Sequence, residues 1–450
     1  MAPRRMFRRK IYDHMLEWKR GEGSTALLIE GARRVGKTTV VREFARNEYR
    51  SHILIDFSVC DDDIKGLIDT YSRGADRFFQ RLQELTGTEL HTRQSLIVFD
   101  EVQLYPRARQ LIKHLVEDGR YDYIETGSLI SIKENVEDIL IPSEEESMDM
   151  HPMDFEEFLW AMGEDQALGM ARDCFEKMMP MGDAVHKKMM RLFKQYVLVG
   201  GMPQAVSKYL ESRDFDDAER AKRRILGLYR EDIGKWANGN TNHVHNVFDR
   251  IPEELNRKDK VFTLSSIDKN ARMREYENSF MWLVDGRIVN LCLNSNNPEI
   301  GLSVYSDRPT LKCYMADTGL LVTHAFSDRR SMENELYKAI LLDGIGINEG
   351  MLMENVVAQT LVSIGDRLFF YSRGREDPDG QMEIDFLIRR NGRICPIEVK
   401  SSKRSRDHKS LDRFRERFGK RLGQSYVIHS KDLSVENGIV YLPVYMTMFL

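Results

Sequence analysis

A glycine-rich segment of this chain has the residues needed to bind a nucleoside triphosphate. The segment GARRVGKTT, residues 31–39, fits the pattern G-x-x-x-x-G-K-[ST]. In such a loop, backbone N–H groups surround the phosphates and a helix begins directly behind them. The lysine reaches the β- and γ-phosphates, and the next hydroxyl binds Mg²⁺. We therefore predict a site for ATP and Mg²⁺ in which Lys37 acts on the phosphates and Thr38 is a metal ligand, formed by Gly31, Arg33, Arg34, Val35, Gly36, Lys37, Thr38 and Thr39.

Two adjacent carboxylates follow a second apolar run. The segment SLIVFDE ends in Asp100 and Glu101. A carboxylate at the carboxyl end of a parallel strand points into the crevice where ligands of such sheets bind. We expect Asp100 to hold Mg²⁺, often through water, and Glu101 to polarise the attacking water. Together with the glycine-rich loop, the pair predicts a site that hydrolyses ATP.

Hydroxyl and guanidinium groups supply further candidates for this site. The run YDYIETGS ends in Thr126 and Ser128. Either hydroxyl could contact the γ-phosphate or the lytic water, with Ser128 as the candidate catalytic residue, and an ordinary turn or helix cap is the alternative. An arginine from a neighbouring subunit would neutralise charge in the transition state. Arg107, Arg230 and Arg250 are equal candidates for it.

A second group of charges lies inside apolar segments near the C-terminus. Asp385 is within one apolar run, and Glu398 and Lys400 flank a valine in the next. Residues two apart in a strand share a face, and pairing of the strands across the polar segment 389–393 would bring Asp385 to that face. Glu354, on the preceding helical segment, could complete the cluster. Because unpaired buried carboxylates are costly, the charges need either an ion pair with Lys400 or a metal ion, and the residues alone leave both open.

The pattern of apolar residues divides the chain into four regions. Residues 1–150 alternate short apolar strands with helices, which is typical of a parallel sheet with crossover helices. Residues 151–240 are mostly helical. Residues 241–330 hold two amphipathic helices followed by short apolar runs that suit a wing or a small sheet. Residues 331–450 return to an α/β pattern.

Composition narrows the class of protein. The 450 residues are 42% hydrophobic and 31% charged, as in ordinary globular proteins. No apolar run approaches the 18 residues of a membrane span, and the basic start lacks the apolar run of a signal peptide. Five scattered cysteines favour a reducing compartment. We expect a cytoplasmic protein without a membrane partner.

Two blocks of like charge divide the sequence further. Residues 134–157 hold ten acids and no Lys or Arg, whereas residues 389–421 hold thirteen Lys and Arg against four acids. The basic block suits a phosphate-binding surface as well as a solvated helix face. Around Glu144, Glu145 and Glu146, the acidic block could also act as a nucleic-acid mimic that covers it.

Eight segments spread in order over residues 31–402 resemble one family: GARRVGKTT, SLIVFDEVQ, ETGS, HPMDFEEFL, YVLVGGMPQAV, LYREDI, YMADTGLL and EIDFLI…IEVKSS. The chain is similar to prokaryotic AAA-type ATPases whose C-terminal part is a DUF4143 domain. This resemblance implies an α/β protein: an AAA-type P-loop NTPase core over 1–150, a helical lid over 151–240, a winged-helix-like domain over 241–330, and a restriction-endonuclease-like domain of the PD-(D/E)xK type over 331–450. It also implies self-association into an ATP-dependent ring or oligomer.

The resemblance gives roles to the C-terminal charges. In the nuclease pattern, Asp385 and Glu398 would bind Mg²⁺ or Mn²⁺, Lys400 would orient the attacking water, and Glu354 would tune the metal. In the winged-helix-like region, the basic residues near the second helix could contact DNA. These are Lys269, Arg272 and Arg274.

Two hypotheses of function follow. In the first, ATP binding and hydrolysis are coupled to a DNA-binding C-terminal domain, with metal-dependent DNA cleavage as an open question. In the second, ATP controls assembly or switching, and an inactive nuclease-like domain binds a protein partner.

Overall fold

The structure is a computed structural model that describes residues 6–71, 74–128, 143–237, 239–257, 259–266, 272–298, 301–326, 349–373, 381–401 and 408–450. The chain divides into two compact units. The first contains residues up to His151 together with Asp285–Arg287, and the second contains Pro152–Val284 and Ile288–Leu450.

The first unit is built on a parallel sheet with helices on both faces. Five strands run in the order β2-β3-β4-β1-β5, and every recorded pairing between them is parallel. The strands are β1 (Ala26–Glu30), β2 (Ser51–Asp56), β3 (Ser95–Asp100), β4 (Asp122–Gly127) and β5 (Glu145–Asp149). The helices are α1 (Lys10–Lys19), α2 (Lys37–Glu48), α3 (Asp62–Asp69), α4 (Ala75–Thr86) and α5 (Pro106–Asp118).

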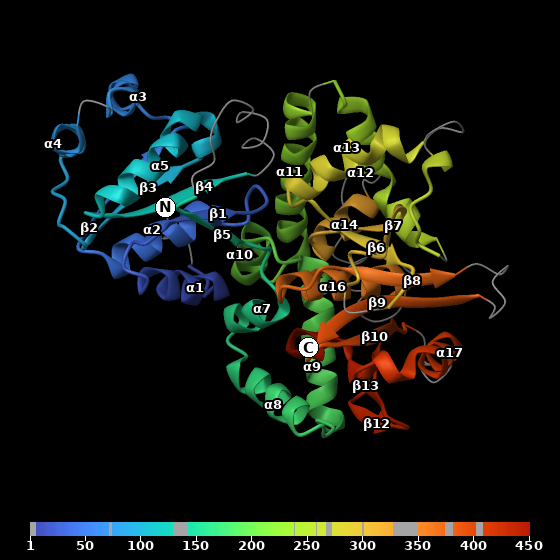
Figure 1. The fold of residues 1–450 in the computed structure, drawn as a ribbon. Helices are drawn as coiled ribbons and strands as arrows, with labels where there is room; N and C mark the ends of the chain where they lie inside the picture. Colours follow the sequence, from blue (N-terminus) through green and yellow to red (C-terminus); the bar gives the residue numbers. More distant parts are fainter. Residues whose placement is uncertain are drawn as a thin grey trace. The chain divides into compact units, whose positions relative to one another are not determined.

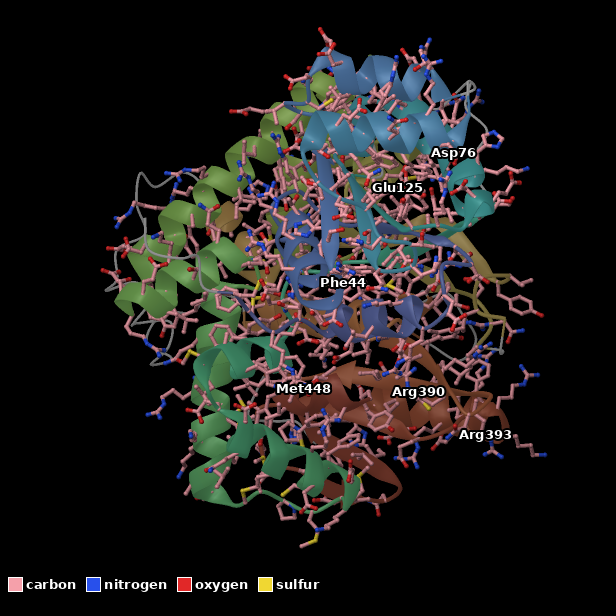
Figure 2. All side chains as sticks on the ribbon, turned by 90° about the vertical axis from the view of Figure 1, so that its left-hand side faces the viewer. Phe44, Asp76, Glu125, Arg390, Arg393 and Met448 are labelled. Atoms are coloured by element: carbon pink, nitrogen blue, oxygen red, sulfur yellow. The ribbon has the colours of Figure 1, made fainter. Side chains whose placement is uncertain are left out.

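Burial on both faces explains the apolar strands of this sheet. Every residue of β1, β3 and β4 is buried, as expected where helices cover each side of a parallel sheet. Helices α1 and α2 lie on one face and α5 on the other (Figure 1). Phe44 of α2 and Glu125 of β4 lie among the packed side chains of this unit (Figure 2). The predicted α/β core is therefore present, with β3, β4 and β1 side by side.

The second unit surrounds a mixed sheet with helices. Its eight strands run in the order β12-β13-β11-β10-β9-β8-β6-β7. They are β6 (Val289–Ser295), β7 (Ser306–Met315), β8 (Phe369–Arg373), β9 (Met382–Arg390), β10 (Arg393–Val399), β11 (Ser425–His429), β12 (Ser434–Glu436) and β13 (Ile439–Pro443). The helices are α7 (Phe155–Met162), α8 (Asp165–Glu176), α9 (Asp183–Val199), α10 (Pro203–Ser212), α11 (Phe215–Trp236), α12 (Thr241–Asn256), α13 (Met273–Asp285), α14 (Thr318–Ala325), α16 (Glu349–Ser363) and α17 (Lys409–Phe418).

The strands expected to form a wing belong to this large sheet. Helices α12 and α13 precede β6 and β7, so the predicted order of elements is present. However, β6 pairs with β7 on one side and with β8 on the other. The hairpin is therefore the edge of the eight-stranded sheet, because its apolar residues are buried there and not on a separate small domain. Of the three basic residues expected to contact DNA, Arg274 lies on α13 and Arg272 directly before it, and Lys269 is outside the described residues.

The hairpin of β9 and β10 forms as the sequence predicted. The strands pair antiparallel, from Arg390 opposite Arg393 to Phe386 opposite Ile397. Both residues of the turn have positive φ, 50° at Asn391 and 73° at Gly392. Asn-Gly is the pair that a tight two-residue hairpin turn favours.

The segments GGMP and ADTGLL, far apart in sequence, meet in the second unit. The carboxylate of Asp317 is buried and accepts hydrogen bonds from the N–H groups of Gly201, at 2.5 Å, and Leu320, at 2.8 Å. A Cβ atom on Gly319 would lie 2.4 Å from the Cα of Gly200. The glycines are therefore needed because the two backbones approach closely. The two segments, which the sequence analysis used only to identify the family, thus have a structural role.

The four predicted regions stay a prediction, since the structure separates two units and the boundary at 330/331 lies outside the described residues. Within the described ranges, every helix is too short or too polar to span a bilayer.

Candidate functional site

The glycine-rich loop connects β1 to α2, as predicted. Gly36 has a φ of 107°, and Arg34 also has a positive φ, 71°. A Cβ atom on Gly31 would lie 2.4 Å from the carbonyl oxygen of Met150, so glycine is required there by the neighbouring backbone. Nζ of Lys37 donates to the carbonyl oxygens of Gly31, at 2.8 Å, and Ala32, at 3.3 Å. The lysine thus lies folded over its own loop.

Asp100 is the centre of a chain of hydroxyl contacts at the carboxyl edge of the sheet. Its Oδ1 accepts from Oγ1 of Thr38 at 2.9 Å and from Oγ1 of Thr126. The N–H of Glu101 donates to the same Thr126 hydroxyl at 3.3 Å. Because β3, β4 and β1 are neighbours, their carboxyl ends bring these residues together. Thr126 therefore links the carboxylate of Asp100 to the backbone of Glu101, and Ser128 lies just beyond the end of β4.

The backbone of Glu101 is strained. Its φ is 56°, in the left-handed region that non-glycine residues rarely adopt. Such conformations cluster at functional sites, where surrounding contacts hold them. Its carboxylate accepts a hydrogen bond from the amide of Gln103. The role of Glu101 in polarising water stays a prediction.

Burial shifts the pKa values of Lys37 and Asp100 in opposite directions. Burial lowers the pKa of Lys37, and the nearby charges of Glu101 and Asp100 only partly offset that effect. Burial raises the pKa of Asp100, against the hydrogen bonds from Thr126 and Thr38 that lower it. Both shifts mean that the charged form of the group lacks a sufficient opposite charge nearby. Mg²⁺ beside Asp100 and a polyphosphate beside Lys37 would supply that charge, so the residues present fit the predicted ligands.

The other predicted residues of this site have distinct surroundings. Val35 is buried, while Arg33, Arg34 and Thr39 are exposed. All three arginines named as candidates for action in a neighbouring subunit have acidic partners within the chain: Arg107 with Asp69, Arg230 with Asp249, and Arg250 with Glu253. The choice among them stays open.

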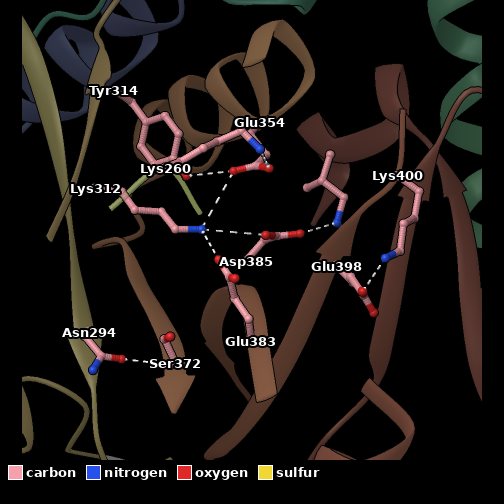
Figure 3. Close-up of polar contacts among 11 residues, drawn as sticks. Lys260, Asn294, Lys312, Tyr314, Glu354, Ser372, Glu383, Asp385, Glu398 and Lys400 are labelled. Carbon is pink, nitrogen blue, oxygen red and sulfur yellow. Dashed lines mark hydrogen bonds and ion pairs between the residues drawn. The ribbon is translucent and has the colours of Figure 1, made fainter. Parts of the chain in front are cut away.

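In the second unit, Asp385 contacts a lysine that the sequence analysis did not single out (Figure 3). Oδ1 of Asp385 lies 3.7 Å from Nζ of Lys312, which is on β7. The same ammonium lies 2.8 Å from Oε1 of Glu383 and 3.9 Å from Oε2 of Glu354. The other oxygen of Asp385 accepts from the N–H of Val399 at 2.8 Å.

Glu354 joins this group from α16, as predicted, but its partners are basic and phenolic groups. Lys260 forms an ion pair with its Oε1, and the hydroxyl of Tyr314 donates to its Oε2 at 3.1 Å. Burial raises the pKa of Glu354, and the negative charge of Asp385 adds to the increase, against Lys312 and Lys260.

Glu398 and Lys400 form the ion pair that was the alternative to a metal site. Nζ of Lys400 lies 2.5 Å from Oε1 of Glu398. Burial raises the pKa of Glu398 to about 7, although Lys400 lowers it. In Figure 3 the recorded contacts place Asp385 with Lys312 and Glu398 with Lys400.

Sequence reasoning missed Lys312, Glu383, Lys260 and Tyr314. One signal could have found the first of them: Lys312 interrupts the apolar run LKCYM, just as Asp385 interrupts its own strand. Within the described ranges, no group of three or more His, Cys, Asp or Glu side chains is arranged to hold a metal ion. The assignment of Asp385 and Glu398 as metal ligands, which names two carboxylates, stays a prediction.

The charged blocks are partly used inside the fold. Glu145 of the acidic block forms a buried, two-pronged ion pair with Arg109, at 2.7 and 2.9 Å. Its residues 134–142 lie outside the described residues, as do 402–407 of the basic block. On α17, Arg415 donates to the carbonyl oxygen of Asn437 at 2.9 Å. Glu145 is thus committed to a structural role, which weakens the mimic hypothesis.

Comparison with known families divides the chain into three matched segments. Residues 23–159 match the family described as AAA domain. Residues 349–446 match the domain of unknown function DUF4143, and residues 190–331 match another, DUF8612. The last match crosses the predicted boundary at residue 240. No curated protein matches the chain.

Solved structures with similar chains are distant. A Walker-type ATPase of Pyrococcus abyssi is 16% identical, covering 71% of this chain and 96% of its own, with a TM-score of 0.42. Cdc6p of Pyrobaculum aerophilum is 13% identical, covering 76% and 97%, with a TM-score of 0.26. A chain of the Drosophila ORC bound to DNA is 14% identical, covering 70% and 94%, with a TM-score of 0.27. Likeness at this level does not define a function for this chain.

The family matches coincide with the two places where the sequence placed its chemistry. The first covers the glycine-rich loop, Asp100 and Thr126, and the last covers Glu354, Asp385 and Lys400. An N-terminal segment that matches an AAA domain and a C-terminal segment that matches DUF4143 thus occur in one chain, as the resemblance predicted.

Proposed function

We propose that the first unit binds and hydrolyses ATP with Mg²⁺. The observation that carries this proposal is the hydroxyl chain from Thr38 through Asp100 to Thr126, which lies beside a lysine folded over a glycine-rich loop. Strands β3 and β4 hold Asp100 and Thr126, and the start of α2 holds Lys37 and Thr38, so little reorganisation is needed to receive a charged ligand.

Each residue has a defined part in this proposal. The loop N–H groups and Lys37 bind the phosphates, and Thr38 with Asp100 holds the metal, which neutralises charge on the phosphates. Glu101 orients and polarises the attacking water. Thr126 fixes Asp100 relative to the backbone of Glu101, so the metal ligand and the water-polarising residue keep one geometry.

Phosphate release by the purified full-length protein tests this proposal. We expect Mg²⁺-dependent turnover that is lost in Glu101→Gln while ATP binding is kept, because the amide cannot polarise water as a carboxylate does. Binding is measured with a fluorescent ATP analogue. Equal turnover in wild type and Glu101→Gln would refute the assignment of Glu101, and absence of nucleotide binding would refute the site.

For the second unit, the contacts favour the hypothesis of a nuclease-like domain that does not cleave. The supporting observations are the ion pair of Glu398 with Lys400 and the contact of Asp385 with Lys312. We infer that ATP state controls assembly or switching, and that this unit binds a partner. A protein partner fits the second hypothesis, while a DNA-binding surface along the basic helix α17 remains the alternative.

Plasmid nicking in Mg²⁺ or Mn²⁺, with and without ATP, separates these two hypotheses. We expect no nicking by wild type beyond that of Asp385→Ala. Nicking that disappears in Asp385→Ala would restore the hypothesis of a metal-dependent nuclease. Binding of the plasmid without nicking, with an affinity that falls steeply at higher salt, would identify a DNA-binding domain.

Self-association belongs to the same proposal. An arginine donated by a second copy would complete the ATP site. Light scattering with and without a non-hydrolysable ATP analogue measures it, and a mass that does not change with nucleotide would exclude ATP-controlled assembly.

A further inference from the structure

The buried ammonium group of Lys312 lies among the carboxylates of the second unit. Its Nζ has three carboxylates around it, Glu383 at 2.8 Å, Asp385 at 3.7 Å and Glu354 at 3.9 Å. The side chain is 1% exposed and also lies over the ring of Phe370, 5.0 Å from its centre. Lys312 comes from β7 and its partners come from β9 and α16, so three elements converge on it (Figure 3).

Charge balance in this cluster is nearly complete without a metal ion. Glu354, Glu383 and Asp385 are faced by Lys312 and Lys260. A divalent ion added beside Lys312 would be repelled by the buried ammonium, because charges in a poorly solvated site interact strongly. Replacement of Lys312 by a neutral residue would instead leave three carboxylates with one lysine, a site that a divalent ion would neutralise.

Hydrogen bonding also suits an ammonium better than a metal. Nζ of Lys312 lies within hydrogen-bond distance of Glu383, at 2.8 Å, and within ion-pair distance of Asp385 and Glu354, at 3.7 and 3.9 Å. Both oxygens of Glu354 and both of Asp385 have partners in the chain, since Tyr314 donates to Glu354 and the N–H of Val399 donates to Asp385. The cluster is thus satisfied by groups of the chain itself.

We propose that Lys312 is a built-in cation that takes the place of a divalent metal in this cluster, so that the wild-type protein binds none there. The inference deepens the proposed non-cleaving role of the second unit and rests on it. It concerns occupancy of the site by a cation, which is measured by binding and separately from cleavage.

The test is binding of Mn²⁺ to the nucleotide-free full-length protein. Binding is measured as the decrease of the electron paramagnetic resonance signal of the free ion. We expect no Mn²⁺ binding in wild type that depends on Asp385. The variant Lys312→Met keeps the length of the side chain and removes its charge, and we expect it to gain one bound Mn²⁺ per chain. Adding Asp385→Asn to this variant should abolish the gain.

Lys222→Met is the matched control. Lys222 is also fully buried, but its Nζ donates to the carbonyl oxygens of Leu198, at 2.7 Å, and Gly319, at 3.3 Å, and its recorded ion pair is with one carboxylate, Glu219 at 3.4 Å, where Lys312 has three. Its replacement should create no Mn²⁺ site. A gain in both variants would mean that destabilisation alone exposes metal ligands, and would overturn the inference.

Two further results would overturn it. One is Asp385-dependent Mn²⁺ binding in wild type, and the other is a folded Lys312→Met protein that binds no Mn²⁺. If Lys312→Met does not fold, Lys312→Gln, which keeps a hydrogen-bond donor without the charge, takes its place, with the same expected gain and the same contradicting result. Nicking by wild type would refute the proposed non-cleaving role, whereas Asp385-dependent binding without nicking would refute only the inference about Lys312.

Discussion

The two units of this protein each gather acidic residues at a sheet, but they hold them by different means. At the five-stranded sheet, the hydroxyls of Thr38 and Thr126 contact Asp100. At the eight-stranded sheet, the ammonium of Lys312 and a backbone N–H contact Asp385. A hydroxyl can hold a carboxylate and still leave its charge for a metal ion, whereas an ammonium neutralises it. We therefore expect the same residue type to serve a ligand in the first unit and packing in the second.

The largest difference should appear in catalysis. Lys37→Ala removes the charge that faces the phosphates, and we expect ATP turnover to fall by about 10²-fold or more. Lys400→Ala should leave turnover unchanged, because Lys400 pairs with Glu398 in the other unit. Steady-state phosphate release measures both. A comparable loss in both variants would show that the second unit takes part in hydrolysis.

Stability should separate the buried lysines next. Lys312→Met leaves a group of carboxylates short of positive charge, at a cost of about 3–5 kcal/mol in the free energy of unfolding. Lys260 contacts only Glu354 among these acids, so we expect Lys260→Met to cost about 1–2 kcal/mol. Guanidinium unfolding followed by tryptophan fluorescence measures both. Equal losses would mean that Glu354 alone anchors the cluster.

Replacing the central aspartate of each site by asparagine should change the stability of the ligand-free protein in opposite directions. Asp100 is 1% exposed and burial raises its pKa, so Asp100→Asn should stabilise the ligand-free protein by about 1 kcal/mol while abolishing ATP turnover. Asp385→Asn removes charge beside Lys312 and should destabilise by about 2 kcal/mol. Thermal unfolding without nucleotide gives the comparison, and a loss of stability in Asp100→Asn would contradict it.

The smallest expected effect is a change in the pH dependence of stability, caused by a residue of the first unit. Burial, and then the neighbouring charge of Glu145, raise the pKa of Glu125 well above its ordinary value. A raised pKa in the folded state means that the folded state binds the proton more tightly, so this contribution is full below about pH 4.3 and decreases as pH rises toward the folded pKa. Glu125→Gln keeps a donor toward Glu145 without a proton to lose. We expect its melting temperature to fall less between pH 5 and 8 than that of wild type.

Glu84→Gln is a control for this comparison, because Glu84 is exposed on α4 and its recorded partner, the amide of Gln80, does not titrate. Its replacement should leave the pH profile of wild type unchanged. Parallel profiles for wild type and Glu125→Gln would show that Glu125 is ionised in the folded protein.

Sequence determined most of the first site. The loop, the helix behind it and the carboxylate pair at a strand end follow from local patterns, since parallel strands place their carboxyl ends at one edge. The order β3-β4-β1 then decided which hydroxyl reaches Asp100. That information is not local, and the sequence left Thr126 and Ser128 open.

In the second unit, sequence determined the hairpin and the presence of charges inside strands, because alternation and an Asn-Gly turn are local signals. It did not determine their partners. Lys312 precedes Asp385 by more than seventy residues, and only the pairing of β6 with β8 brings its strand into the same sheet. A buried carboxylate has the same sequence signal whether its counter-ion is a metal or a lysine, so only the tertiary structure could show that Lys312 contacts Asp385.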